Sequence, residues 1–350
     1  MPSVKYMLLM KKPRLVIESH VPCVPDELGE YFDIERIAPE DIIPEAVADA
    51  DAMIIRTRTR CNADLLGGSR VRFIATATIG TDHIDRQWCE SHGITIASAP
   101  GCNAPAVAQY VTASLLALMP EGLKDKTIGV VGVGHVGSIV ADWAAQLGMK
   151  VLLNDPPRAL AEPGFNNTPL DELLPVADVV TFHVPHIKGG DFPTHHIADA
   201  ALFDKLKPGA VVINSARGPI VKTDDLVVAL ESGKVGRAVI DCWEGEPEIS
   251  RRLLELVSIA TPHIAGYSLN GKIRATMMAV NALCEYFGVD YRMVAEGVPA
   301  GAAEYVTAEA IAQSYNPLDD TRVLREAAGQ ADFAARFESL RNHYDLRREV

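Results

Sequence analysis

Three short segments far apart in the chain carry residue types that could together move a proton and direct a hydride. They supply Arg217 in "NSARG", Glu246 in "DCWEGEP" and His263 in "TPHIAG". An arginine can hold a carboxylate through two parallel hydrogen bonds. A histidine paired with a carboxylate transfers a proton near neutral pH. With a hydride acceptor bound nearby, this set indicates oxidation of a 2-hydroxy acid to a 2-oxo acid.

A glycine-rich loop upstream of these residues indicates what the hydride acceptor is. Gly132, Gly134 and Gly137 form the pattern GxGxxG between an apolar run, 127–131, and a helical segment, 137–148. Glycines at these positions allow a tight turn and a close approach of backbone N–H groups to a pyrophosphate. The N-terminus of the following helix favours the same negative charge. The loop therefore predicts a bound dinucleotide.

Two acidic residues at strand ends extend the predicted cofactor site. Asp155 ends the strand-like run after the loop, where a carboxylate accepts hydrogen bonds from ribose hydroxyls and repels a 2′-phosphate. NAD is therefore predicted rather than NADP, although Arg158 close by weakens this preference. Asp241 ends a later run and could hold the nicotinamide carboxamide, or it could cap a helix. Glu244 competes with Glu246 for the role of catalytic acid, and the sequence alone does not choose between them.

The composition excludes several other classes of function. The chain has 350 residues, of which 48% are hydrophobic, and a net charge of −13, which argues against nucleic-acid or membrane binding. The first residues contain only a short apolar run, too short for a signal peptide. Six cysteines form no CxxC pair, so no metal site is predicted. Free thiols of this kind suit the reducing cytoplasm.

Strand-like and helical runs alternate along most of the chain, which predicts an α/β fold with two doubly wound parallel sheets. The expected strands are 14–19, 51–57, 72–78, 94–100, 127–132, 150–155, 178–184, 210–216, 237–243 and 258–263, and long helices are expected at 104–119 and 270–287.

These motifs resemble the D-isomer-specific 2-hydroxyacid dehydrogenase family. The resemblance rests on segments 75–85, 98–111, 152–159, 241–248, 261–276 and 340–349. It implies a flavodoxin-like substrate-binding (lid) domain from 12–103 and 267–288, and a Rossmann NAD-binding domain over 104–266. It also implies that 289–350 form a small C-terminal α+β dimerisation domain, so a homodimer is expected.

By position, the resemblance makes Arg217, Glu246 and His263 catalytic, with His263 the acid and base. The predicted substrate contacts are Thr57, Thr78 and Tyr267. The full set of predicted cofactor contacts is Gly132, Gly134, His135, Val136, Gly137, Asp155, Val184, Ala216, Asp241 and Gly266. Val184 departs from the family pattern, which usually has a threonine that touches NAD at this position.

The resemblance also implies a phosphorylated substrate, which needs cations. The segment "RTRTR" supplies Arg56, Arg58 and Arg60, which would share one face if they continue a strand. We expect Arg56 to reach the phosphate; the alternative is a solvated edge strand. The tail is expected to reach a partner's active site through Arg347 or Arg348.

Two competing functions stay open on the sequence. One is another D-2-hydroxyacid dehydrogenase, acting for example on 3-phosphoglycerate or hydroxypyruvate. The other is a non-catalytic, NAD-sensing binding protein built on the same scaffold.

Overall fold

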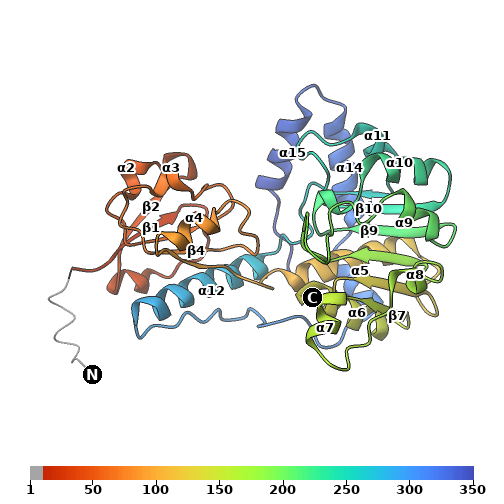
Figure 1. Cartoon of the computed structure of the whole chain (residues 1–350), viewed down its shortest axis with the longest axis horizontal. Helices are drawn as coiled ribbons and strands as arrows, with labels where there is room; N and C mark the ends of the chain where they lie inside the picture. Colours follow the sequence, from red (N-terminus) through yellow and green to blue (C-terminus); the bar gives the residue numbers. More distant parts are fainter. Residues whose placement is uncertain (1–10) are drawn as a thin grey trace. The chain divides into compact units, whose positions relative to one another are not determined.

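The computed structural model describes residues 11–350, which fall into two compact units (Figure 1). The first unit contains the described residues up to Asn103 together with Asn270–Ala300. The second contains Ala104–Leu269 and Gly301–Val350. The segment 289–350 is thus not a unit of its own, because it is divided between the two. No helix within residues 11–350 has the length and apolar character needed to cross a membrane.

The first unit is built on a five-stranded parallel sheet with the order β2-β1-β3-β4-β5. This is the flavodoxin-like strand order. Its elements are β1 (Arg14–Glu18), η1 (Asp26–Glu30), β2 (Asp33–Ile37), η2 (Pro39–Asp41), α2 (Pro44–Val47), β3 (Ala52–Ile55), α3 (Ala63–Leu66), β4 (Phe73–Thr76), α4 (Arg86–Ser91), β5 (Thr95–Ala97) and α12 (Leu269–Phe287).

Both faces of this sheet are buried, as parallel sheets require. In β1, Leu15 and Ile17 pack against α12 through Ala279 and Leu283, whereas Val16 faces the opposite cluster. Side chains that alternate between faces therefore serve two cores. The edge strand β2 was missing from the predicted set, because its sequence "DIERI" is charged and mostly exposed. Charged edges of this kind discourage pairing with other chains.

The second unit has a six-stranded parallel sheet with the order β11-β10-β9-β8-β6-β7. Its elements before the tail are α5 (Ala104–Leu118), β6 (Thr127–Val131), α6 (His135–Gln146), β7 (Lys150–Asn154), α7 (Pro156–Ala161), α8 (Leu170–Leu173), β8 (Val179–Phe182), α9 (Ala200–Lys205), β9 (Ala210–Asn214), η3 (Gly218–Ile220), α10 (Thr223–Glu231), β10 (Val235–Ile240), α11 (Arg251–Leu256) and β11 (Ile259–Ala260). The two predicted doubly wound sheets are both present.

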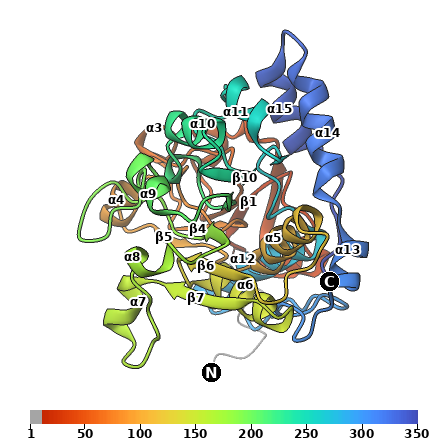
Figure 2. The same cartoon turned by 90° about the vertical axis from the view of Figure 1, so that its right-hand side faces the viewer.

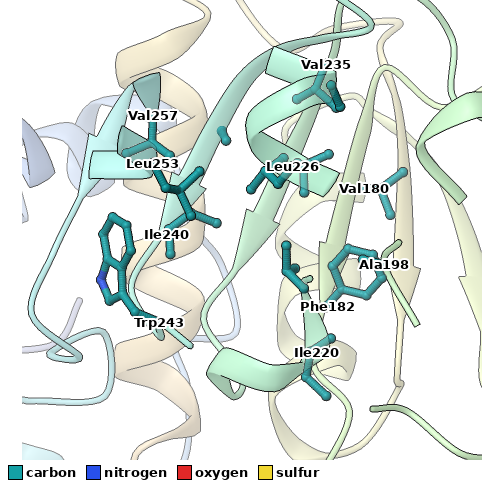
Figure 3. Close-up of a cluster of buried hydrophobic side chains, with 14 of the residues drawn as sticks. Val180, Phe182, Ala198, Ile220, Leu226, Val235, Ile240, Trp243, Leu253 and Val257 are labelled. Atoms are coloured by element: carbon teal, nitrogen blue, oxygen red, sulfur yellow. The ribbon is translucent and has the colours of Figure 1, made fainter. Parts of the chain in front are cut away.

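Two hydrophobic clusters cover the two faces of the second sheet. α5 and α6 cover one face, where Val130 and Trp143 are buried. The other face holds the buried cluster shown in Figure 3, which extends from Trp243 through Leu226 to Phe182. This packing holds the carboxyl ends of the strands at one edge of a rigid sheet.

The tail after residue 300 extends the core of the second unit. It forms α13 (Ala308–Ser314), α14 (Pro317–Ala328) and α15 (Phe333–Asn342), with α13 beside α5 (Figure 2). Leu324, Phe333 and Phe337 are buried in the same cluster as the sheet residues of Figure 3. The Thr321 hydroxyl accepts a hydrogen bond from the N–H of Ala260 in β11, at 3.1 Å. These scattered apolar positions join an existing core rather than building a separate one.

If the tail is part of this core, truncating one of its buried side chains should destabilise the second unit. We expect Phe337→Ala to lower the free energy of unfolding by about 3–5 kcal/mol, because a fully buried ring leaves a cavity. Arg336→Ala on the same helix is the control, since its exposed pair with Asp332 contributes at most about 1 kcal/mol. Urea denaturation measures both changes. Equal stability of the two variants would show that the tail packs independently.

Candidate active site

The glycine loop has the geometry expected of a dinucleotide site. Gly132 follows β6 with a φ of +87°, and a Cβ there would lie 2.8 Å from the backbone of His183. A Cβ on Gly137 would lie 2.0 Å from the carbonyl oxygen of Gly132. Gly134 caps α6 and has open space around it. Only this middle glycine leaves room for a pyrophosphate to approach the backbone.

Other predicted cofactor residues lie in the first turn of α6 and beside the glycine loop. His135 is exposed and Val136 half-buried in the first turn of α6. Val184 is half-buried beside Gly132, since a Cβ on that glycine would meet the Val184 side chain at 2.7 Å. A valine offers no side-chain hydrogen bond at this position, so a cofactor contact there would come from its backbone. His183 bonds Thr181 at 3.0 Å.

Asp155 ties the end of β7 to the glycine loop. Its Oδ2 accepts a hydrogen bond from the N–H of Val133 at 2.8 Å, and its Oδ1 accepts one from the backbone N–H of Arg158 at 3.0 Å. The Arg158 guanidinium donates to the carbonyl of Val133 at 2.7 Å and to Glu162 at 2.9 Å. The charge of Arg158 is therefore paired with an acid on its own helix, which reduces its attraction for a 2′-phosphate.

The catalytic candidates come from three neighbouring strands. Arg217 follows β9, Glu246 follows β10 and His263 follows β11, and these strands are adjacent in the sheet. Because the strands are parallel, their carboxyl ends meet at one edge. Three residues that are far apart in sequence therefore share one region of the second unit.

Glu246 and His263 form a hydrogen-bonded pair. His263 Nδ1 lies 2.8 Å from Oε2 of Glu246, while Oε1 accepts a hydrogen bond from the N–H of Trp243 at 2.7 Å. Burial by itself would raise the pKa of the Glu246 carboxyl, but the hydrogen bond and charge of His263, the Trp243 N–H and Arg341 hold it below its usual value. Glu246 therefore stays anionic and fixes the tautomer of the histidine.

Glu244, the competing acid, has different partners. Its Oε1 lies 2.5 Å from Nε2 of His196, and its Oε2 accepts a hydrogen bond from the N–H of Thr223 at 3.1 Å. Of the two acids, Glu246 is the one that contacts His263, which favours Glu246 as the acid of the predicted catalytic pair.

Asp241 holds the turn that carries His263. Its Oδ1 accepts hydrogen bonds from Thr261 Oγ1 and the N–H of Ile264, both at 2.7 Å, and its Oδ2 accepts one from the N–H of Ala265 at 3.0 Å. Its backbone carbonyl accepts the N–H of His263, which has a φ of +59°. Burial raises the pKa of Asp241, against the lowering effects of His263 and these donors. The sequence missed this role of Asp241.

The same turn continues to two further predicted residues. Gly266 and Tyr267 are half-buried, and the N–H of Tyr267 donates to the carbonyl of Ile264 at 2.8 Å. The Tyr267 hydroxyl accepts a hydrogen bond from Nε of Arg341 at 3.3 Å. A tail residue thus reaches the predicted substrate contact.

Asn214 and Gly218 bring the Arg217 loop against the Glu246 loop. The Asn214 amide donates to the carbonyls of Arg217 at 2.9 Å and Cys242 at 3.2 Å. A Cβ on Gly218 would lie 1.9 Å from the carbonyl oxygen of Trp243, so the two loops need a glycine there. Arg217 Nη1 donates to the carbonyl of half-buried Ala216 at 2.8 Å. Sequence reasoning missed both positioning residues, although a glycine directly after the catalytic arginine was a usable signal.

Three predicted substrate residues lie in the first unit. Thr57 is exposed, and Thr78 Oγ1 lies 2.6 Å from Thr76 Oγ1. The segment "RTRTR" does not continue β3, which ends at Ile55, so the condition under which its arginines would share one strand face is not met. Instead, the Thr59 hydroxyl and the backbone N–H of Arg56 donate hydrogen bonds to the buried carboxylate of Glu18, at 2.9 and 2.8 Å.

The tail arginine Arg347 makes several hydrogen bonds within its own chain. Its Nη1 donates to the carbonyl of Ile264 at 3.1 Å, its Nη2 to Ala265 and Ala106, and its Nε to Gln109 at 3.2 Å. It therefore bonds carbonyl groups of the same turn whose N–H groups bond Asp241. Among residues 11–350, no group of three or more His, Cys, Asp or Glu side chains is placed to hold a metal ion.

Comparison with known proteins identifies the family of the chain. Residues 106–265 match the model of the D-isomer specific 2-hydroxyacid dehydrogenase NAD-binding domain. The erythronate-4-phosphate dehydrogenase of Bacteroides fragilis (strain YCH46) is 46% identical over 96% of this chain and 97% of its own length. The chain belongs to the D-isomer-specific 2-hydroxyacid dehydrogenase family. It is an NAD-dependent oxidoreductase that acts on a CH–OH group.

More distant relatives share the architecture of this dehydrogenase. The erythronate-4-phosphate dehydrogenase of Salinibacter ruber is 39% identical over 97% of this chain and 93% of its own length. A solved D-lactate dehydrogenase from Aquifex aeolicus, complexed with NAD and lactic acid, aligns with a TM-score of 0.62 and 26% identity, covering 79% of this chain and 96% of that one. The two parallel-sheet α/β domains expected from the sequence are therefore confirmed.

The open space at Gly134 allows a test of the cofactor loop. We expect Gly134→Ala to change the stability of the cofactor-free protein by no more than about 1 kcal/mol. NAD binding should weaken about tenfold or more, because the methyl group occupies the approach to the pyrophosphate. Gly137→Ala should instead destabilise the fold itself. Thermal unfolding without NAD and calorimetric titration with NAD measure the two effects. Unchanged NAD affinity in Gly134→Ala would contradict the assignment.

The two acids of one loop provide a matched test of the catalytic pair. We expect Glu246→Gln to lower kcat by about 10²–10⁴-fold, since the imidazole loses its anionic partner, and Glu244→Gln to keep most activity. The lowered pKa of Glu246 also links it to stability: its contribution is present above the unfolded pKa of about 4.3 and is lost as pH falls through the folded value. Steady-state rates and urea denaturation at several pH values measure both. Equal rate losses in the two variants would refute the assignment of Glu246, rather than Glu244, to the pair with His263.

Proposed function

We propose that this dehydrogenase oxidises 4-phospho-D-erythronate at C2 to (R)-3-hydroxy-2-oxo-4-phosphobutanoate with NAD, a step of pyridoxine (vitamin B6) biosynthesis. Relatives named erythronate-4-phosphate dehydrogenase, 38–46% identical over nearly the whole chain, support this substrate. The observation that carries the chemistry is the 2.8 Å contact between His263 and Glu246, formed beside the Arg217 loop.

The chain's own residues bind the substrate and move its proton. Arg217 holds the carboxylate and polarises the C2 oxygen. Because Nδ1 of His263 is committed to Glu246, Nε2 is the nitrogen that takes the proton of the C2 hydroxyl. Glu246 stabilises the imidazolium that results. Bound NAD supplies the acceptor for the hydride that leaves C2.

The remaining predicted residues have supporting roles in this proposal. Thr57, Thr78 and Tyr267 contact the substrate, and Arg56 contacts its phosphate. The pyrophosphate and adenosine are held by the glycine loop with His135 and Val136, and by Asp155. Val184, Ala216, Asp241 and Gly266 contact the rest of the cofactor.

We also propose that the protein is a cytoplasmic homodimer. Six free cysteines, five of them buried, suit a reducing compartment. In the tail, Tyr305 and Leu318 are exposed apolar side chains that a second copy could cover. Light scattering should then give twice the chain mass of 37.8 kDa, and a mass of one chain would refute the dimer.

The experiment that tests the function is NAD reduction with 4-phospho-D-erythronate, with D-3-phosphoglycerate in parallel. Each acid is assayed with and without an added 2-oxo acid, so that a retained reduced cofactor can be recycled. We expect turnover of 4-phospho-D-erythronate. Turnover of 3-phosphoglycerate alone would keep the chemistry and overturn the substrate. If NAD binds and neither acid is oxidised, a sensing role would replace the enzymatic one.

A further inference from the structure

Arg341, in the last turn of α15, brings a guanidinium group of the tail to the catalytic pair. Its Nη1 lies 3.9 Å from Oε2 of Glu246, the same oxygen that contacts His263. Its Nε donates to the hydroxyl of Tyr267 at 3.3 Å. The side chain is 23% exposed, so it is largely buried yet open to small molecules. All four residues belong to the second unit.

The hydrogen-bonding capacity of Arg341 is mostly unused. Its Nη1 also lies 3.9 Å from Oε1 of Glu338, and both ion pairs are too long for hydrogen bonds. Within the described chain, neither Nη atom has an acceptor at hydrogen-bond distance. Arg347 differs, since all three of its nitrogens donate to protein oxygens. A largely buried guanidinium with open donors is suited to bind an anion through two parallel bonds.

Arg341 and Arg217 also act on the same buried atom. Burial and the charges of Asp241 and Glu246 raise the pKa of the Cys242 thiol, whereas Arg217 and Arg341 both oppose that rise. Both guanidinium groups therefore lie near enough to Cys242 to act on its thiol; Arg217 follows β9 and Arg341 belongs to α15. In a chain with a net charge of −13, this is a local concentration of positive charge.

We propose that Arg341, in addition to Arg56, binds the phosphate of the substrate while Arg217 binds its carboxylate. This rests on the proposed function, in which one small acid carries an anionic group at each end. The guanidinium groups of Arg341 and Arg217 can each bind one of the two anionic groups of such a molecule. The phosphate docks on the open Nη donors without displacing a short hydrogen bond, because the contact with Glu246 is long. The tail thereby becomes part of the substrate site of its own chain.

The kinetic test compares Arg341→Ala and Arg341→Lys with Arg336→Ala, an exposed arginine on the same helix. KM and kcat are measured for 4-phospho-D-erythronate and for D-erythronate, which lacks the phosphate. We expect Arg341→Ala to raise KM for the phosphorylated acid about 10- to 100-fold, with a much smaller change for D-erythronate. Arg341→Lys should recover part of the loss, and Arg336→Ala should behave as wild type.

A structural role for Arg341 gives a different pattern. If it only positions Glu246, kcat falls equally for both acids and KM for the phosphorylated acid is not selectively raised, which would overturn the proposal. The unfolding midpoint of each variant shows whether it is folded. If Arg341→Ala is not, Arg341→Lys carries the test, because it keeps the charge and loses the bidentate fork.

Binding of inorganic phosphate to the NAD-loaded enzyme separates this proposal from the proposed function. By calorimetry, Arg341→Ala should bind phosphate about tenfold more weakly than wild type or Arg336→Ala. Equal affinity in all three proteins would overturn the site. If wild type fails to oxidise 4-phospho-D-erythronate but its phosphate affinity depends on Arg341, the proposed substrate is wrong and the anion site stands.

Discussion

The buried carboxylate of Asp241 is the constraint on which the rest of the active site depends. Burying a charge is unfavourable unless donors compensate it, and here three donors from the turn after β11 do so. The same bonds keep His263 in a left-handed backbone conformation that residues other than glycine rarely adopt. The position of the His263 imidazole is therefore set by a group that lies outside the pair it forms with Glu246.

Two other parts of the chain support this turn. Tyr110 of α5 contacts the hydroxyl of Thr261 at 2.7 Å, and because that hydroxyl donates to Asp241, the tyrosine is the donor. Arg347 of the tail holds the carbonyls of Ile264 and Ala265. The turn is thus fixed through its N–H groups by a carboxylate and through its carbonyls by a guanidinium. This explains why a segment near the end of the chain belongs to the unit that carries the chemistry.

The sequence was most informative where one residue type has one physical use. The glycines at 132, 134 and 137 and the order Arg217, Glu246, His263 led to the prediction of a cofactor loop and a catalytic set, and the structure places the three polar residues after neighbouring strands. The sequence could not distinguish Glu244 from Glu246, since both are acids in one loop; their hydrogen-bond partners in the folded chain do. The tail was the least predictable part, because its few apolar residues complete a core built elsewhere. The sequence did not distinguish Arg341 from the other charged residues of the tail; its contact with Glu246 appears only once α15 is packed on the second unit.

The measurement that tests this account most directly is the single-turnover rate of hydride transfer in Asp241→Asn, compared with its dissociation constant for NAD. If Asp241 acts by holding the His263 turn, the substituted amide cannot accept all three donors, and the rate at saturating NAD should fall about 10²-fold or more. NAD affinity, measured separately, reports the contact that Asp241 is proposed to make with the cofactor. If the rate at saturating NAD equals that of wild type, Asp241 acts as a cofactor ligand alone, and the central role given to its carboxylate is wrong.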